Sequence, residues 1–223
     1  MKAMILAAGR GERMGHLTKD TPKPLTRISS FTLIEHNILK LKEVGIVDLV
    51  INISWLGEKI REYLGDGEDL GVSITYMDES ETMLGTGGGI LNALPYLGND
   101  PFWLVNADVY SDFRINPSTK LNKTDLGHLI LVPNPPHNCH GDFSLDNSRI
   151  IYPAKKEALT FSGMSLISPK LFSDSNEKVF PLEPLLESSA KENRLSGEIN
   201  KDYWIDVGTE DRLEDLKREL SRR

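Results

Sequence analysis

The chain of 223 residues has little cysteine and no long apolar run. Its one cysteine, Cys139, excludes a disulfide bond within the chain. No apolar run approaches the roughly 20 residues that a membrane-spanning helix needs. The N-terminal residues also lack the charged and then apolar segments of a signal peptide. We therefore expect a cytoplasmic protein that has no membrane partner.

An excess of positive charge is missing as well. The 26 Lys and Arg residues stand against 33 Asp and Glu residues, and the net charge is −7. Because binding to a phosphate backbone needs a basic face, we expect no nucleic-acid partner. The hydrophobic content of 39% is enough for a substantial core, and the length predicts a single domain over residues 1–223.

Two common nucleotide-binding motifs are absent. No G-x-x-x-x-G-K-[ST] motif occurs, and Gly9, Gly11 and Gly15 give G-x-G-x-x-x-G where a dinucleotide fingerprint has G-x-G-x-x-G. A dehydrogenase would also have an acidic residue closing its second strand, where Ile53-Ser54 stands. These differences disfavour both a P-loop protein and a dehydrogenase.

A different phosphate-binding loop is predicted near the N-terminus, where an apolar run breaks into small residues at 7–13. Gly9 and Gly11 let the backbone approach a ligand closely, because they have no β-carbon. Arg13 and Lys23 supply positive charge, and the prolines on both sides of Lys23 stiffen its segment. An ordinary glycine-rich turn with surface basic residues is the alternative, but it explains the Pro-Lys-Pro sequence poorly.

Apolar periodicity predicts alternating helices and strands. This pattern is typical of βαβ units on a parallel sheet. Before residue 110, helices are predicted at 32–44, 55–64 and through 90–97, and strands at 47–53, 72–76 and 102–105. After it, we expect strands at 129–132, 143–145 and 159–167, a helix at 182–190, a hairpin-like return from 196–198 to 203–209, and a last helix capped by Thr209.

Several further positions suit ligand binding but also have ordinary structural explanations. The glycines between Gly85 and Gly89 either present backbone to a nucleotide or permit close helix packing. Asp108 closes a predicted buried strand, where ligands bind in open α/β sheets, but an Asp there also caps turns. His137, Cys139 and His140 do not have the spacing of a structural zinc site.

Five segments together resemble the sugar-1-phosphate nucleotidylyltransferases. They are Leu6–Met14 with Pro22–Leu25, Leu84–Gly88, Asn106–Asp108, Gly141–Phe143 and Asp206–Thr209. The resemblance extends over essentially the whole chain. It implies a Rossmann-like α/β fold with three layers, α/β/α, around a mostly parallel mixed sheet, as in nucleotide-diphospho-sugar transferases.

The same resemblance implies a site and a reaction. Arg13 and Lys23 would be catalytic, and Asp108 and Asp206 would bind Mg²⁺, although Asp206 also suits a structural turn contact. Nucleotide contacts are expected from Ala8, Gly9, Gly11, Glu12, Arg13, Lys23, Gly85, Thr86 and Gly88, and sugar contacts from Asn106, Asp142, Ser162 and Gly163.

The expected partners are a nucleoside triphosphate and a sugar 1-phosphate. The resemblance favours transfer of UMP from UTP to N-acetylmuramate α-1-phosphate in peptidoglycan recycling, giving a UDP-sugar and pyrophosphate. A hexose-1-phosphate guanylyl- or thymidylyltransferase and a non-catalytic nucleotide-binding regulator remain alternatives. The regulator would be expected to lack Arg13, Lys23 or one of the two Asp residues, and all four are present.

Overall fold

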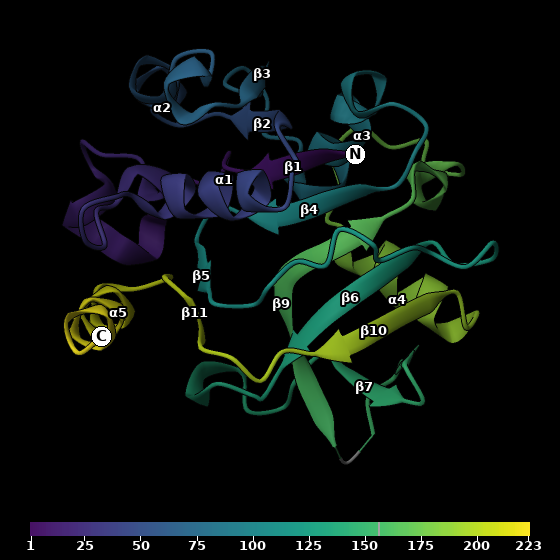
Figure 1. Ribbon diagram of the computed structural model, residues 1–223. Coiled ribbons are helices and arrows are strands. Elements are labelled where there is room, and N and C mark those ends of the chain that lie inside the picture. Colours follow the sequence, from purple (N-terminus) through teal and green to yellow (C-terminus); the bar gives the residue numbers. More distant parts are fainter. Residues whose placement is uncertain (156) are drawn as a thin grey trace.

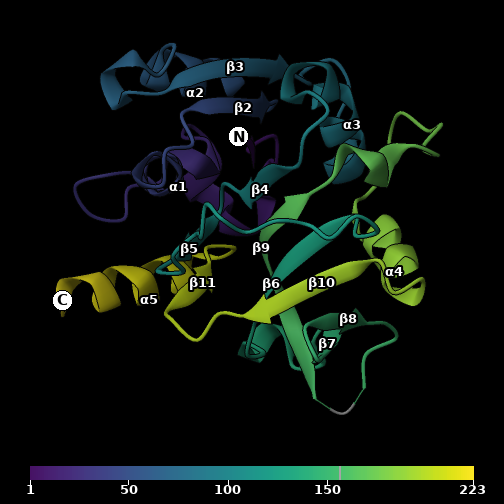
Figure 2. The ribbon, with the colours of Figure 1, turned by 45° about the vertical axis from the view of Figure 1, so that its right-hand side comes forward.

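The computed structural model describes residues 1–155 and 157–223, and in them nine strands form one sheet in the order β3-β2-β1-β4-β9-β6-β10-β8-β7 (Figures 1 and 2). These strands are β1 (Lys2–Leu6), β2 (Asp48–Ile53), β3 (Ser73–Asp78), β4 (Phe102–Asn106), β6 (Gly127–Val132), β7 (Phe143–Asp146), β8 (Arg149–Ile151), β9 (Ala158–Ile167) and β10 (Leu195–Ile199). A second small sheet pairs β5 (Val109–Ser111) with β11 (Trp204–Asp206).

The main sheet is mixed, with a parallel half. β3, β2, β1 and β4 pair in parallel, and so do β6 and β10. β9 runs antiparallel between β4 and β6, and β8 is antiparallel to β10 and β7. All described strands of this sheet except β8 and β9 therefore point the same way, which confirms the predicted mostly parallel mixed sheet.

Helices cover both faces of this sheet. They are α1 (Leu33–Glu43), α2 (Gly57–Leu64), α3 (Gly85–Leu97) and α4 (Glu183–Lys191), whereas α5 (Glu210–Ser221) packs beside the small sheet. Side chains of a strand point alternately to opposite faces. Ala3 and Ile5 of β1 accordingly pack in the cluster with α1 and α2, while Met4 packs in the cluster with α3 and α4. This arrangement confirms the predicted α/β/α layers.

Local signals set the ends of α1 as the sequence predicts. Thr32 is its N-cap, and its side chain forms a capping box with Glu35. The helix ends at Glu43, and Gly45 follows with a φ of +79°, a backbone conformation that glycine adopts without strain. The other predicted strands and helices are confirmed to within a few residues, with β5 and β8 as additional strands.

The predicted hairpin near the C-terminus is wrong. β10 pairs with β6 and β8 in the main sheet, whereas β11 pairs with β5. Between them, Asn200 donates its backbone N–H to Leu131 O, and its buried side chain donates to Ser111 Oγ at 3.3 Å. These hydrogen bonds direct the chain from the main sheet to β5, so the segment crosses over and does not turn back.

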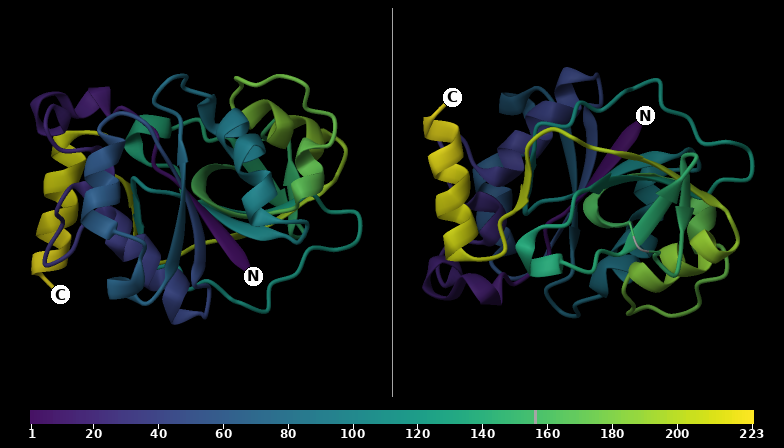
Figure 3. Two further views of the ribbon diagram at one scale, coloured as in Figure 1. Left: turned by 90° about the horizontal axis from the view of Figure 1, so that it is seen from above. Right: turned by 90° about the horizontal axis from the view of Figure 1, so that it is seen from below.

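The last helix, α5, lies beside the N-terminal loop segment (Figure 3). Its Leu213 and Leu216 pack with Met14 and Ile28 of that segment and with Tyr110 of β5. The C-terminal helix therefore helps to hold the segment in which the sequence predicts phosphate binding.

No helix among the described residues has the length and apolar composition to cross a membrane.

The docking of α5 predicts a large stability difference between two neighbouring positions. Leu216 is fully buried, so Leu216→Ala should lower the free energy of unfolding by about 2 to 5 kcal/mol through lost burial and a residual cavity. The exposed Asp215 is the matched control, and Asp215→Ala should change it by less than about 1 kcal/mol. Urea denaturation measures both, and equal effects would contradict this packing.

Candidate active site

The loop after β1 packs tightly around one lysine. Gly11 has a φ of +67°, and a β-carbon added to it would lie 3.1 Å from both Lys23 Cβ and Thr18 Cγ2. Thr18 Oγ1 also donates to Gly11 O at 3.0 Å. Lys23 begins the short 3₁₀ helix η2 (Lys23–Leu25) and is only 8% exposed. The absence of a side chain at Gly11 therefore lets the loop close over the lysine.

A cavity of about 610 Å³ opens at the carboxyl ends of β1, β2 and β4. This is the edge of an open α/β sheet where ligands bind. Ten of the predicted site residues line it, namely Ala8, Gly9, Gly11, Glu12, Arg13, Lys23, Gly85, Thr86, Asn106 and Asp108. Gly88, Asp142, Ser162, Gly163 and Asp206 are outside its lining.

The glycine cluster at the start of α3 divides between two roles. Gly85 and Thr86 face the cavity. Gly87 and Gly88 pack against another segment instead, because both donate their backbone N–H to Phe180 O, and a β-carbon on Gly88 would lie 2.2 Å from Lys178 O. The structure therefore gives Gly88 a packing role and does not bring it into the lining of the cavity.

A buried polar pair in the lining of the cavity, Asn52 and Glu79, was not predicted from the sequence. Asn52 Nδ2 donates to Glu79 Oε1 at 2.9 Å, and Asn52 Oδ1 accepts from the N–H of Ala7 at 2.9 Å. Burial raises the pKa of Glu79, while its hydrogen bond with Asn52 acts in the opposite direction. The signal was present, because Asn52 interrupts the apolar run of β2 near its carboxyl end.

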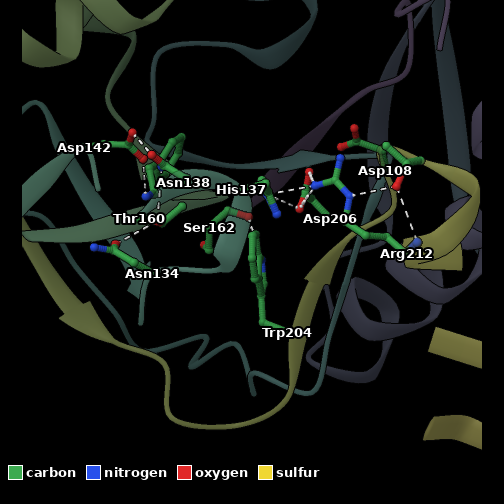
Figure 4. A network of polar contacts seen from close by, with 12 residues as sticks. Asp108, Asn134, His137, Asn138, Asp142, Thr160, Ser162, Trp204, Asp206 and Arg212 are labelled. Atoms are coloured by element: carbon green, nitrogen blue, oxygen red, sulfur yellow. Dashed lines mark hydrogen bonds and ion pairs between the residues drawn. The ribbon is translucent and has the colours of Figure 1, made fainter. Parts of the chain in front are cut away.

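The pairing of β5 with β11 brings the two predicted metal ligands together, although they are 98 positions apart in the sequence (Figure 4). Asp206 lies opposite Val109 in this ladder, and the N–H of Val207 donates to Asp108 O at 2.8 Å. Asp108 also forms an ion pair with Lys23 through Oδ2. The fold thus unites Lys23, Asp108 and Asp206 in one charged centre.

Asp206 contacts two side chains, Arg212 and His137, that were not predicted from the sequence as site residues. Arg212 Nη1 donates to both Asp206 oxygens at 2.6 Å, and His137 Nε2 lies 2.9 Å from Oδ1. Arg212 comes from the first turn of α5, and His137 from the 3₁₀ helix η4 (Pro136–Asn138). No motif linked them, because His137, Asp206 and Arg212 belong to three separate elements, η4, β11 and α5.

The donor chemistry of this centre fits Mg²⁺. Asp108, in the turn between β4 and β5, and Asp206 of β11 offer the hard oxygen ligands that Mg²⁺ prefers, and their side chains are 32% and 21% exposed, respectively. Mg²⁺ is often held by one or two carboxylates together with substrate phosphates and water, so a third protein ligand is not required. In the described residues, Lys23 and Arg212 neutralise Asp108 and Asp206, respectively.

The predicted sugar side is built on β9. Gly163 has a φ of +78°, and a β-carbon there would lie 2.7 Å from Asn106 Nδ2, so this glycine allows close approach of Asn106. Ser162 is buried, and its carbonyl accepts from Trp204 Nε1 at 2.9 Å. These contacts place Ser162 and Gly163 between Asn106 and β11.

Asp142 lies farther from the charged centre (Figure 4). Its Oδ2 accepts from the N–H of Phe161 at 2.7 Å, and its Oδ1 accepts from Asn138 Nδ2 at 3.0 Å. The carboxylate thereby attaches the loop at 133–142 to β9. This structural use of the carboxylate differs from the sugar contact that the resemblance implies.

Comparison with known proteins identifies related chains. The family model described as nucleotidyl transferase matches residues 2–144. An N-acetylmuramate alpha-1-phosphate uridylyltransferase from Neisseria meningitidis serogroup B is 44% identical over 97% of this chain and 97% of its own. A D-glycero-alpha-D-manno-heptose 1-phosphate guanylyltransferase from Campylobacter jejuni is 31% identical over 93% of this chain and 95% of its own.

Solved structures agree on the fold. The crystal structure of HddC from Yersinia pseudotuberculosis superimposes with a TM-score of 0.78 at 22% identity, covering 98% of this chain and 99% of that one. At this identity the likeness concerns the fold alone. The family model and the two relatives show that the chain is an enzyme of the nucleotidyl transferase family.

Proposed function

We propose that this enzyme transfers UMP from UTP to N-acetylmuramate α-1-phosphate and releases pyrophosphate, as one step of peptidoglycan recycling, with residues 1–223 acting as one catalytic domain. The meeting of Lys23, Asp108 and Asp206 beside the cavity carries the chemistry of this proposal. The 44% identical uridylyltransferase supports the choice of base and sugar. The 31% identical guanylyltransferase makes GTP with another sugar 1-phosphate the second candidate.

The reaction needs no activated nucleophile on the protein. An oxygen of the sugar 1-phosphate, already an anion, attacks the α-phosphorus of UTP. The new O–Pα bond forms as the bond from Pα to the oxygen of the β-phosphate breaks, and that oxygen leaves with its electron pair in pyrophosphate. The protein therefore contributes mainly by positioning two anions and stabilising their charge.

Two cations of the N-terminal segment suit this task. Arg13 is exposed at the cavity wall, where it can neutralise the leaving pyrophosphate. Lys23 is held by the closed loop, so its ammonium group can stabilise charge at the α-phosphate without first being ordered. Backbone of Ala8, Gly9 and Gly11 would contact the phosphates, with Glu12 at the same wall.

Asp108 and Asp206 would hold Mg²⁺, which supplies positive charge to the phosphate oxygens when it is bound. Gly85 and Thr86, which also line the cavity, would contact the nucleotide. The proposed sugar contacts are Asn106, Ser162, Gly163 and, at the far end of the loop at 133–142, Asp142.

The role of Lys23 predicts a large loss of turnover. Lys23→Ala should lower kcat by about a hundredfold or more, because removal of an aimed charge costs a few kcal/mol of transition-state stabilisation. The exposed Lys19 of the same segment is the control, and Lys19→Ala should keep near-normal turnover. Steady-state pyrophosphate release, with thermal melting to establish folding, measures both. Near-normal turnover of folded Lys23→Ala would contradict the role.

A substrate panel tests the proposed specificity. Pyrophosphate release would be measured with UTP, dTTP and GTP against N-acetylmuramate, N-acetylglucosamine, glucose and mannose 1-phosphates. We expect UTP with N-acetylmuramate α-1-phosphate to have the highest kcat/KM, because buried polar contacts can reject substrates that lack the matching group. A higher kcat/KM with a hexose 1-phosphate, or with GTP or dTTP, would refute the specificity and leave the reaction class intact.

A further inference from the structure

Arg212 is a largely buried cation that contacts neither substrate in the proposed mechanism. Its side chain is 12% exposed and extends from the first turn of α5 toward Asp206. Within the described residues, its hydrogen bonds use Nη1, which contacts Asp206 and His137, and Nε, which lies 3.4 Å from Thr209 Oγ1. The Nη2 amino group is therefore left to interact with a further acceptor.

That amino group lies against the wall of the cavity. A β-carbon added to Gly208, which lines the cavity, would lie 2.1 Å from Arg212 Nη2 and 3.2 Å from Arg13 Nη2. Two guanidinium groups thus approach the same glycine from different segments of the chain. Like charges so placed repel each other, and an oxyanion that accepts hydrogen bonds from them relieves this repulsion.

The position of Arg212 points to the acceptor substrate, the sugar 1-phosphate, and not to the nucleotide. Gly208 lines the nucleotide cavity, whereas Arg212, Asp206 and His137 do not. His137 Nε2 is 2.8 Å from Arg212 Nη1, and His137 belongs to the loop that is attached to β9. Arg212 therefore lies between the charged centre and the proposed sugar side.

We infer that Arg212, with His137 beside it, neutralises Asp206 in the free enzyme and binds an oxyanion of the acceptor in the complex. The oxyanion is either the 1-phosphate or a carboxylate carried by the sugar, and the planar guanidinium suits both groups. This assignment rests on the proposed function, in which an anionic acceptor approaches the triphosphate. It makes Arg212 a binding and specificity residue for the acceptor.

Isothermal titration tests the assignment on the full-length protein with Mg²⁺ and a non-hydrolysable UTP analogue. Arg212→Gln should raise the Kd for N-acetylmuramate α-1-phosphate about ten- to a hundredfold, since a charge-assisted hydrogen bond is lost. The Kd for the UTP analogue should stay within about twofold, because Arg212 lies outside the nucleotide lining. The matched control is Arg218→Gln on the same helix, whose exposed guanidinium pairs only with Asp215 within the described residues, and it should change neither Kd.

N-Acetylglucosamine 1-phosphate, which has no carboxylate, distinguishes the two candidate oxyanions. If Arg212→Gln weakens binding of the N-acetylmuramate compound alone, Arg212 binds the carboxylate. If it weakens binding of both compounds equally, Arg212 binds the 1-phosphate. An unchanged acceptor Kd overturns the inference, as does weakening of the UTP analogue alone. If the wild type does not bind the N-acetylmuramate compound, the proposed specificity fails, and the N-acetylglucosamine arm still tests Arg212.

Arg212→Gln leaves Asp206 without its main partner, so folding is checked by thermal melting. Should this variant not fold, Arg212→Lys carries the test, because it keeps the charge beside Asp206 and removes the second amino group of the guanidinium. Its acceptor Kd should rise about three- to tenfold at an unchanged Kd for the UTP analogue. An acceptor Kd equal to that of the wild type in folded Arg212→Lys would also overturn the inference.

Discussion

The pairing of β5 with β11 places two carboxylates side by side, and the site depends on how their charge is balanced. Asp108 and Asp206 would repel each other without nearby cations. Lys23 from the N-terminal segment pairs with the first, and Arg212 from α5 pairs with the second. The same two ion pairs therefore connect the N-terminal segment and α5 to the small sheet and the turn that precedes it.

The balance also prepares the site for substrates. Asp108, Asp206, Lys23 and Arg212 each have a counterpart of opposite charge in the free chain, so none of these four groups is left partly buried without a partner, which would be costly. A bound metal cation can replace Lys23 and Arg212 as the partner of the two carboxylates. The anionic phosphates of the two substrates can replace the carboxylates as partners of Lys23 and Arg212. We therefore expect binding to exchange partners among charges that are already in place, with limited rearrangement of the backbone.

Much of the fold was predictable because local signals agree with it. The apolar strands, Thr32 as the helix cap and the glycine loop each have a short-range physical cause. The polar partners were harder, since Asn52–Glu79 and His137–Asp206–Arg212 join residues from separate elements. The wrong hairpin has the same origin, because the partner of β11 is β5, nearly a hundred residues earlier.

Anomalous diffraction from a crystal with Mn²⁺ and a non-hydrolysable UTP analogue tests the exchange of charge partners most directly. Mn²⁺ accepts the same oxygen ligands as Mg²⁺ and can be located by its anomalous signal. The account predicts Mn²⁺ on the carboxylates of Asp108 and Asp206, with Lys23 no longer paired to Asp108 and Arg212 no longer paired to Asp206. Mn²⁺ bound by phosphates alone, with both ion pairs intact, would contradict it.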